Sequence, residues 1–112
     1  MSAKNQTQRA TGAAVIATSL TVTDPSELVC VKLHLSAAGG AAENFTITND
    51  TTYVADVYDT VYFSQDMNTT TDVLWVPDQP IPLSIGDVLD FAYNNANTRT
   101  YGLEIVYRKV GV

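Results

Sequence analysis

Apolar and polar side chains alternate in one short segment after another, and this period of two limits the fold more than any other feature of the sequence. A β-strand places successive side chains on opposite faces of its sheet. Residues 27–36, ELVCVKLHLS, are the clearest case. The pattern predicts a strand with one buried face. We expect Val29, Val31, Leu33 and Leu35 on that face, and Cys30, Lys32 and His34 on the other.

The same alternation recurs along the rest of the chain. Turn-forming residues separate the segments roughly every 8–12 residues, and we find neither a helical period nor an internal repeat. About seven or eight short strands at this spacing predict an all-β fold, an antiparallel β-sandwich that is jelly-roll-like. The buried faces are expected to carry Leu20 and Val22, Phe45 and Ile47, Leu89, Phe91 and Tyr93, and Tyr101, Leu103, Ile105 and Tyr107.

Residues 72–87, DVLWVPDQPIPLSIGD, contain the only Trp and three of the four prolines. Proline donates no hydrogen bond to a sheet ladder, so Pro77, Pro80 and Pro82 predict an extended connection that leaves one sheet and joins the other. Trp75 stands at the end of the strand before this connection. It either plugs the core beneath the crossing or lies exposed as a stacking platform for a sugar or a protein partner.

The chain is long enough for one domain with one core, and residues 13–112 are expected to form a single β-sandwich domain. Residues 1–12, MSAKNQTQRATG, are polar, and we expect them to form a flexible N-terminal arm. The arm carries Lys4 and Arg9, two of the six basic residues. It is either a disordered terminus or a segment that becomes ordered on a neighbouring subunit.

The distribution of charge is more informative than the net charge of −6. No Lys or Arg occurs between Lys32 and Arg99. An acidic surface of this kind repels phosphates, which argues against nucleic acid as a partner. It is either a solvated face or a site for a cation or a basic partner. The acids of this stretch are Glu43, Asp50, Asp56, Asp59, Asp66, Asp72, Asp78, Asp87 and Asp90.

No apolar run reaches the roughly 18 residues that a membrane-spanning helix needs, and the polar N-terminus does not resemble a signal peptide. We therefore expect synthesis in a cytoplasm without secretion, and no membrane partner. The single cysteine, Cys30, excludes an internal disulfide and a zinc site built from several cysteines.

The sequence offers little for catalysis. His34, the only histidine, does not belong to a recognisable arrangement of nucleophile, base and acid. Asp56 and Asp59 form a candidate carboxylate pair, but glycoside hydrolysis would also need a deep cleft between them. Residues 66–72, DMNTTTD, match a calcium loop only in part, because its glycine and its final glutamate are missing. We expect no catalytic residue, no cofactor and no bound metal.

The C-terminal half, from Tyr58 onward, resembles small all-β structural proteins of tailed bacteriophages, which include head decoration (cement) proteins. The similar features are PIPLSIGDVLDF, residues 80–91, before the penultimate strand, and RTYGLEIVYRK, residues 99–109, in the closing strand. The resemblance implies a non-enzymatic virion structural protein, made in the host cytoplasm, that stabilises the phage head as a capsid decoration subunit. Its partners would be the major capsid protein or other virion subunits, and further copies of itself.

Five residues are candidates for the interface that this role requires. Lys4 and Arg9 lie in the expected arm. Tyr58 and Tyr62 lie in or beside a segment that is apolar on both faces, so a neighbouring subunit is expected to cover it. Trp75 is the fifth candidate. The alternative function is a carbohydrate-binding, host-adhesion module of a phage tail or fibre, in which Trp75, Tyr58 and Tyr62 would stack against sugar rings.

Overall fold

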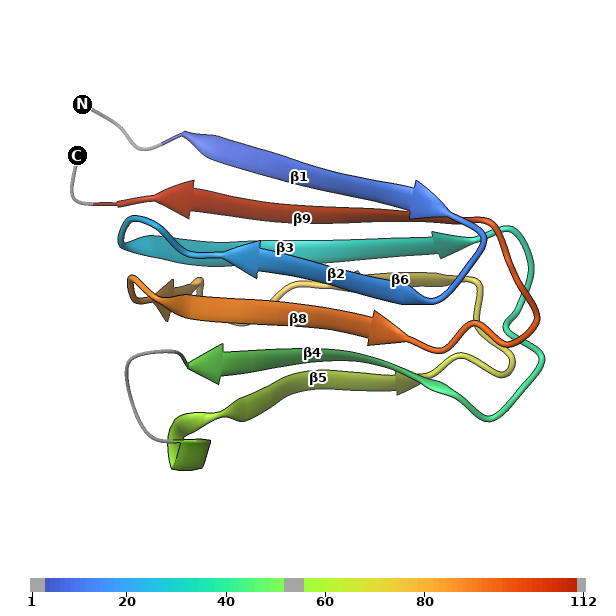
Figure 1. The fold of residues 1–112 in the computed structure, drawn as a ribbon. Coiled ribbons are helices and arrows are strands. Elements are labelled where there is room, and N and C mark those ends of the chain that lie inside the picture. Colours follow the sequence, from blue (N-terminus) through green and yellow to red (C-terminus); the bar gives the residue numbers. More distant parts are fainter. Residues whose placement is uncertain (1–3, 52–55, 111–112) are drawn as a thin grey trace.

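Two antiparallel β-sheets pack face to face in the computed structural model, which describes residues 4–51 and 56–110 (Figure 1). A short 3-10 helix, η1 (Asp56–Tyr58), precedes β5. The structure therefore confirms an all-β antiparallel sandwich, and its jelly-roll type stays a prediction. Sheet A contains β1 (Asn5–Gly12), β9 (Tyr101–Lys109), β3 (Ser26–Leu35) and β6 (Asp72–Trp75) in that order, with β7 (Ile81–Leu83) also paired to β3. Sheet B contains β2 (Ile16–Thr21), β8 (Asp87–Tyr93), β4 (Asn44–Thr51) and β5 (Thr60–Asp66) in that order.

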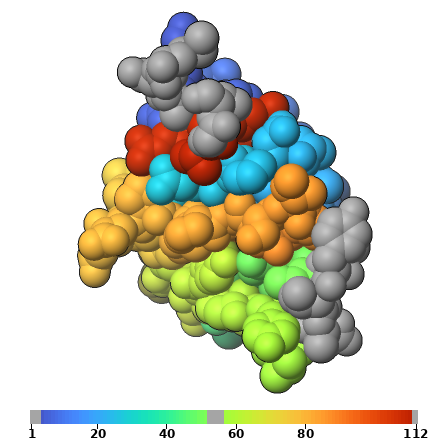
Figure 2. Space-filling view, turned by 90° about the vertical axis from the view of Figure 1, so that its left-hand side faces the viewer, coloured from blue at the N-terminus to red at the C-terminus, as the bar shows by residue number. Residues whose placement is uncertain are grey.

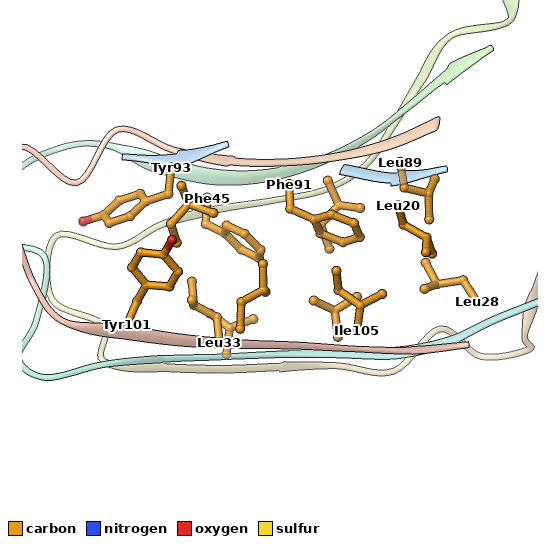
Figure 3. Packing of buried hydrophobic residues seen from close by; sticks show 14 of the residues in the cluster. Leu20, Leu28, Leu33, Phe45, Leu89, Phe91, Tyr93, Tyr101 and Ile105 are labelled. Carbon is orange, nitrogen blue, oxygen red and sulfur yellow. The ribbon is translucent and has the colours of Figure 1, made fainter. Parts of the chain in front are cut away.

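The core lies between the two sheets, where their apolar faces meet. Leu20, Leu89 and Phe91 of sheet B face Leu28 and Ile105 of sheet A (Figure 3). Burial of apolar surface contributes about 25 cal/mol per Å², so this layer is the main source of stability. The faces predicted for β2, β4 and β8 are confirmed, as is that of β9 up to Ile105, while Tyr107 is partly buried against the core.

The N-terminal segment is a strand, and the expectation of a flexible arm is wrong for residues 5–12. All eight residues of β1 pair with β9, from Asn5 opposite Arg108 to Gly12 opposite Tyr101. The hydroxyl of Thr11 also donates a hydrogen bond to the carbonyl oxygen of Tyr101 over 2.7 Å. The prediction was based on the polar composition of this segment. An edge strand of a sandwich can be polar, because the backbone hydrogen bonds to its neighbour hold it in place. Residues 1–3 lie outside the described residues.

A β-bulge changes which residues of β3 face the core. Leu28 pairs with Tyr107 and Cys30 pairs with Val106, so Val29 has no partner on β9. An extra residue in one strand reverses the alternation on either side of it. Leu28 is therefore fully buried, whereas Val29 is only partly buried and does not share the face of Val31 as the simple alternation predicted.

The proline-rich connection does not cross between the sheets. Both β6 and β7 pair with β3, so Pro77 and Pro80 lie between two strands of sheet A, and Pro82 lies within β7. The crossing to sheet B follows Leu83, where Gly86 has a φ of 91° and the carboxylate of Asp87 accepts a hydrogen bond from the amide of Ser84 over 2.9 Å. The predicted passage from one sheet to the other between Val76 and Val88 is therefore confirmed, but it lies after the prolines and not over them. A strand so short, bound on one side only, tolerates proline because few of its amides have a partner to lose.

Loops at one end of the sandwich are linked to one another by hydrogen bonds. The amide of Gly39 donates to the carbonyl oxygen of Met67 over 2.9 Å, and the side chain of Asn97 donates to the carbonyl oxygen of Gly39 over 2.7 Å. Arg99 donates through Nε to the carbonyl oxygen of Ala38 over 2.8 Å. These bonds join three loops, 36–43, 67–71 and 94–100, and fix that end of the molecule.

Candidate functional site

The residues predicted for an interface are not brought together by the fold. Lys4 precedes β1 and Arg9 lies on it, at one edge of sheet A (Figure 1). Tyr58 lies on η1 and Tyr62 on β5, at the opposite edge of the sandwich and in sheet B. Trp75 lies on β6, the far edge of sheet A. The candidates thus divide between two opposite edges, which have different chemistry.

We call the edge formed by β5 and β6, with η1, the acidic edge. Each of its elements carries exposed apolar side chains: Val57 on η1 is 82% exposed, and Leu74 on β6, opposite Lys32, is 66% exposed. Figure 2 shows η1 and the start of β5 at the opposite end of the view from the terminal strands. Exposed large apolar side chains are candidates for contact with a partner. Seven large apolar side chains of the described residues are exposed. Five of them lie on or next to the elements of this edge: Val57, Tyr58, Val61, Leu74 and Val76. The other two are Val15 and Ile85.

Aromatic rings close the core beneath this edge. The ring of Trp75 lies 5.5 Å from that of Phe63, at an interplanar angle of 33°. Phe63 in turn meets the buried Phe45 edge-on at 6.4 Å. Because Trp75 belongs to sheet A and Phe63 to sheet B, their contact joins the two sheets where no ladder hydrogen bonds do. This position supports the interpretation of Trp75 as a plug of the core rather than as a free platform.

The two tyrosines have different surroundings. Tyr62 sits at a bulge of β5, because Ile47 pairs with Phe63 and Thr48 with Val61. It therefore turns inward with Phe63, and its hydroxyl accepts a hydrogen bond from the Nδ2 of Asn49 over 2.9 Å. Tyr58 is 64% exposed, so of the two it is the ring available to a partner.

The acidic edge has carboxylates held in fixed positions and no basic residue. The carboxylate of Asp59 accepts hydrogen bonds from both the amide and the hydroxyl of Thr51, each over 2.9 Å. That of Asp66 accepts one from the amide of Asn68 over 2.9 Å. Since β4, β5, β6 and β8 contain no Lys or Arg, these charges have no cation on their own strands.

We call the opposite edge, formed by β1 and β2, the basic edge. Residues 1–23 contain Lys4 and Arg9 and no Asp or Glu. Arg9 lies 3.6 Å from the carboxylate of Glu104 on β9, and the Arg9 side chain remains 72% exposed. The side chain of Gln8 on β1 donates to the carbonyl oxygen of Ser19 on β2 over 3.0 Å, which ties the two sheets together at this edge. The basic edge is thus polar, and acids of the neighbouring strands also reach it: Glu104 pairs with Arg9, and the carboxylate of Asp90 on β8 accepts a hydrogen bond from the hydroxyl of Ser19 on β2 over 2.9 Å.

A groove that the sequence did not indicate crosses the outer face of sheet A. It has a volume of about 580 Å³ and is lined by residues from β1, β9, β3 and β6. Gly102 forms its floor, and a Cβ atom added there would meet nothing within 4 Å. Arg9, Lys32, His34, Asp72 and Glu104 line it with charges of both signs. Only the register of four strands distant in sequence brings these residues together, so the sequence carries no local signal for the groove.

His34 and Asp72 form a pair on this face, with 2.5 Å between Nδ1 and the carboxylate oxygen. The hydrogen bonds from His34 and Thr71 hold the pKa of Asp72 below its ordinary value. A catalytic triad would need a nucleophile beside the pair. Of the groove's residues only Thr11 has a hydroxyl, and it is bonded to the carbonyl of Tyr101. The pair forms a cross-strand contact between β3 and β6, and the hydroxyl of Thr71 donates a hydrogen bond to the other carboxylate oxygen of Asp72 over 3.1 Å.

No cluster of three or more His, Cys, Asp or Glu side chains suited to a metal ion occurs in residues 4–51 and 56–110. No helix in the described part of the chain has the length and apolar character to cross a membrane.

No protein-family model matches this chain, and no curated protein matches its sequence. The resemblance to phage structural proteins therefore depends on the two motifs at residues 80–91 and 99–109 alone.

Proposed function

We propose that this chain is a non-enzymatic structural protein of a bacteriophage virion, and that it decorates the capsid and stabilises the head. The observation that carries the proposal is the division of the surface into two opposite edges, one apolar and acidic and one polar and basic. Such edges suit contact with flat protein surfaces, whereas a small substrate needs an enclosed pocket with convergent polar groups. Its location is the virion, after synthesis in the host cytoplasm, and its partners are the major capsid protein or other virion subunits.

We further propose that the sandwich is a jelly roll. If β7 is set aside, the remaining strands pair from the outside of the chain inward: β1 with β9, β2 with β8, β3 with β6, and β4 with β5. A long hairpin wrapped around a core pairs its strands in this way, and jelly rolls are common in viral capsid proteins and lectins. Because a fold does not fix a function, this order supports the proposal only by analogy.

The test uses heads assembled from the major capsid protein that the same genome encodes. The purified chain should bind these heads saturably in a co-sedimentation assay. Bound chain should also raise the temperature at which the heads dissociate, because a protein that binds only the assembled lattice stabilises it by mass action, and many equivalent sites add avidity.

A matched pair of variants makes the assay specific. Val61→Lys places a charge on the exposed acidic edge, whereas Ile85→Lys places one at an exposed position outside that edge. We expect the first to weaken binding to heads and the second to leave it unchanged. Absence of the chain from purified virions, together with no binding to heads of any maturation state, would contradict the proposal.

A carbohydrate-binding module of a tail or fibre remains the alternative, and the groove on sheet A is the observation in its favour. The groove contains no aromatic side chain, and Trp75 and Tyr62 are occupied by contacts with the core. Stacking against sugar rings would therefore depend on Tyr58. A glycan that shifts the Trp75 fluorescence and protects groove residues in an NMR titration would favour this alternative over the structural role.

A further inference from the structure

We infer that copies of this chain associate head to tail, with the acidic edge of one copy against the basic edge of the next. The inference deepens the proposed function by naming a partner for both edges. Its test needs only the purified chain, so failure to self-associate and failure to bind heads are separate results. Three properties of the two edges carry the inference: strand direction, charge and exposed apolar surface.

The directions of the edge strands suit stacking in both sheets at once. In sheet A three antiparallel steps separate β1 from β6, so these two edge strands run in opposite directions. In sheet B three antiparallel steps also separate β2 from β5, so these two strands run in opposite directions as well. Consider a second copy that is shifted without rotation, in the plane of the sheets and across the strands (Figure 1). Its β1 would lie antiparallel to β6 of the first copy, and its β2 would lie antiparallel to β5 of the first copy. Open edges with unpaired backbone groups are natural templates for such pairing.

The two sheets also end side by side at each edge, so a second copy that reaches an edge can contact both sheets at once. At the basic edge, Gln8 of β1 is bonded to Ser19 of β2. At the acidic edge, Trp75 of β6 contacts Phe63 of β5. The basic edge thus presents β1 and β2, whereas the acidic edge presents β5 of sheet B and β6 of sheet A, with β7 next to β6 along β3. The two edges face in opposite directions across the sandwich.

Charge selects this arrangement over a two-fold dimer. The basic edge belongs to a segment, residues 1–23, that has two basic residues and no acid. The acids on or beside β5 and β6 are Asp59, Asp66, Asp72 and Asp78, and these elements contain no Lys or Arg. A two-fold dimer through the acidic edge would place acids against acids, whereas a head-to-tail contact places them against Lys4 and Arg9. It would also place a second copy beside exposed apolar side chains of both edge strands, Val61 on β5 and Leu74 on β6.

The experiment measures molar mass by light scattering after size exclusion, over a range of protein and salt concentrations. The wild-type chain should form oligomers at low salt whose mass rises with concentration, because a head-to-tail contact closes into a ring or extends into a filament. Mass should fall toward the monomer as salt shortens the Debye length from about 30 Å at 0.01 M to about 3 Å at 1 M. A two-fold contact between acidic edges would show the reverse dependence on salt.

Two variants then identify the surfaces. The basic-edge variant is Lys4→Glu with Thr7→Glu, which leaves the Arg9–Glu104 contact in place. The acidic-edge variant is Val61→Lys with Asp78→Lys, both at exposed positions. Circular dichroism confirms that each is folded. We expect each variant alone to be monomeric and their equimolar mixture to associate, since each retains the edge that the other has lost.

Other outcomes overturn the inference. Monomers of the wild-type chain under all conditions would do so, and so would a basic-edge variant that associates like the wild-type chain. An acidic-edge variant that alone loses association, with no recovery on mixing, would assign the contact to a two-fold dimer instead.

Discussion

At the end of the sandwich where hydrogen bonds join the loops, the position of Gly39 leaves no space for a larger side chain. A Cβ atom at Gly39 would lie 2.4 Å from the Tyr93 hydroxyl and 2.6 Å from the Met67 carbonyl oxygen. Gly39→Ala should therefore lower the free energy of unfolding by about 1–3 kcal/mol, the usual cost of overpacking. Urea unfolding followed by circular dichroism measures this. Gly102→Ala is the matched control, because a Cβ there meets nothing within 4 Å. Equal stability of the two variants would contradict the prediction.

The carboxylate of Asp72 should have a lower pKa than an ordinary aspartate. The hydrogen bonds from His34 and Thr71 lower its pKa in the folded state. Because the folded pKa lies below the unfolded value of about 3.9, the carboxylate adds stability above that value and loses it as pH falls through the folded pKa. In an NMR titration, His34→Ala should move the pKa of Asp72 back toward its ordinary value, and Lys32→Ala should move it much less. An unchanged pKa in His34→Ala would show that the contact does not form in solution.

At the scale of elements, β1 is part of the folded domain. Deleting residues 1–12 would remove all eight pairs with β9 and leave β9 as the new edge of sheet A. We expect a loss of more than about 2 kcal/mol in the free energy of unfolding, since a backbone hydrogen bond contributes about 1 kcal/mol net. Deleting residues 1–4 is the control and should change little. A full deletion that unfolds at the wild-type urea concentration would contradict this prediction.

The strands that were predicted well are those whose alternation marks one buried face, such as β8 and β9. The strand β1 and the two bulges could not be predicted from this alternation. β1 is held by its partner's backbone rather than by apolar side chains, and the bulges at Val29 and Tyr62 depend on register with another strand. The predicted interface stays a prediction: Tyr58 is exposed, whereas Tyr62 and Trp75 contact the core. The groove could not be predicted, because it arises from four strands that are distant in the sequence.

At the scale of the whole molecule, neither sheet can form without the other. Among the described strands, β4 and β5 are the only paired strands that follow each other in the chain, and every other pairing joins strands with at least one strand between them. The chain repeatedly passes from one sheet to the other, so long-range pairing must form in both layers together. We therefore expect one cooperative unfolding transition. Trp75 fluorescence, which reports the junction between the sheets, should change at the same urea concentration as the far-UV circular dichroism.

Phe63→Leu removes the ring that Trp75 contacts and should lower the stability by about 0.5–1.5 kcal/mol beyond the lost burial. If the molecule unfolds as one unit, this variant shifts the midpoints of both probes equally, although the substitution lies at one edge. If the acidic edge opened on its own, the fluorescence midpoint would fall while that of circular dichroism stayed in place. Coincident midpoints would show that this edge stays folded as long as the rest of the molecule does, so that a partner binding there does not have to fold it first.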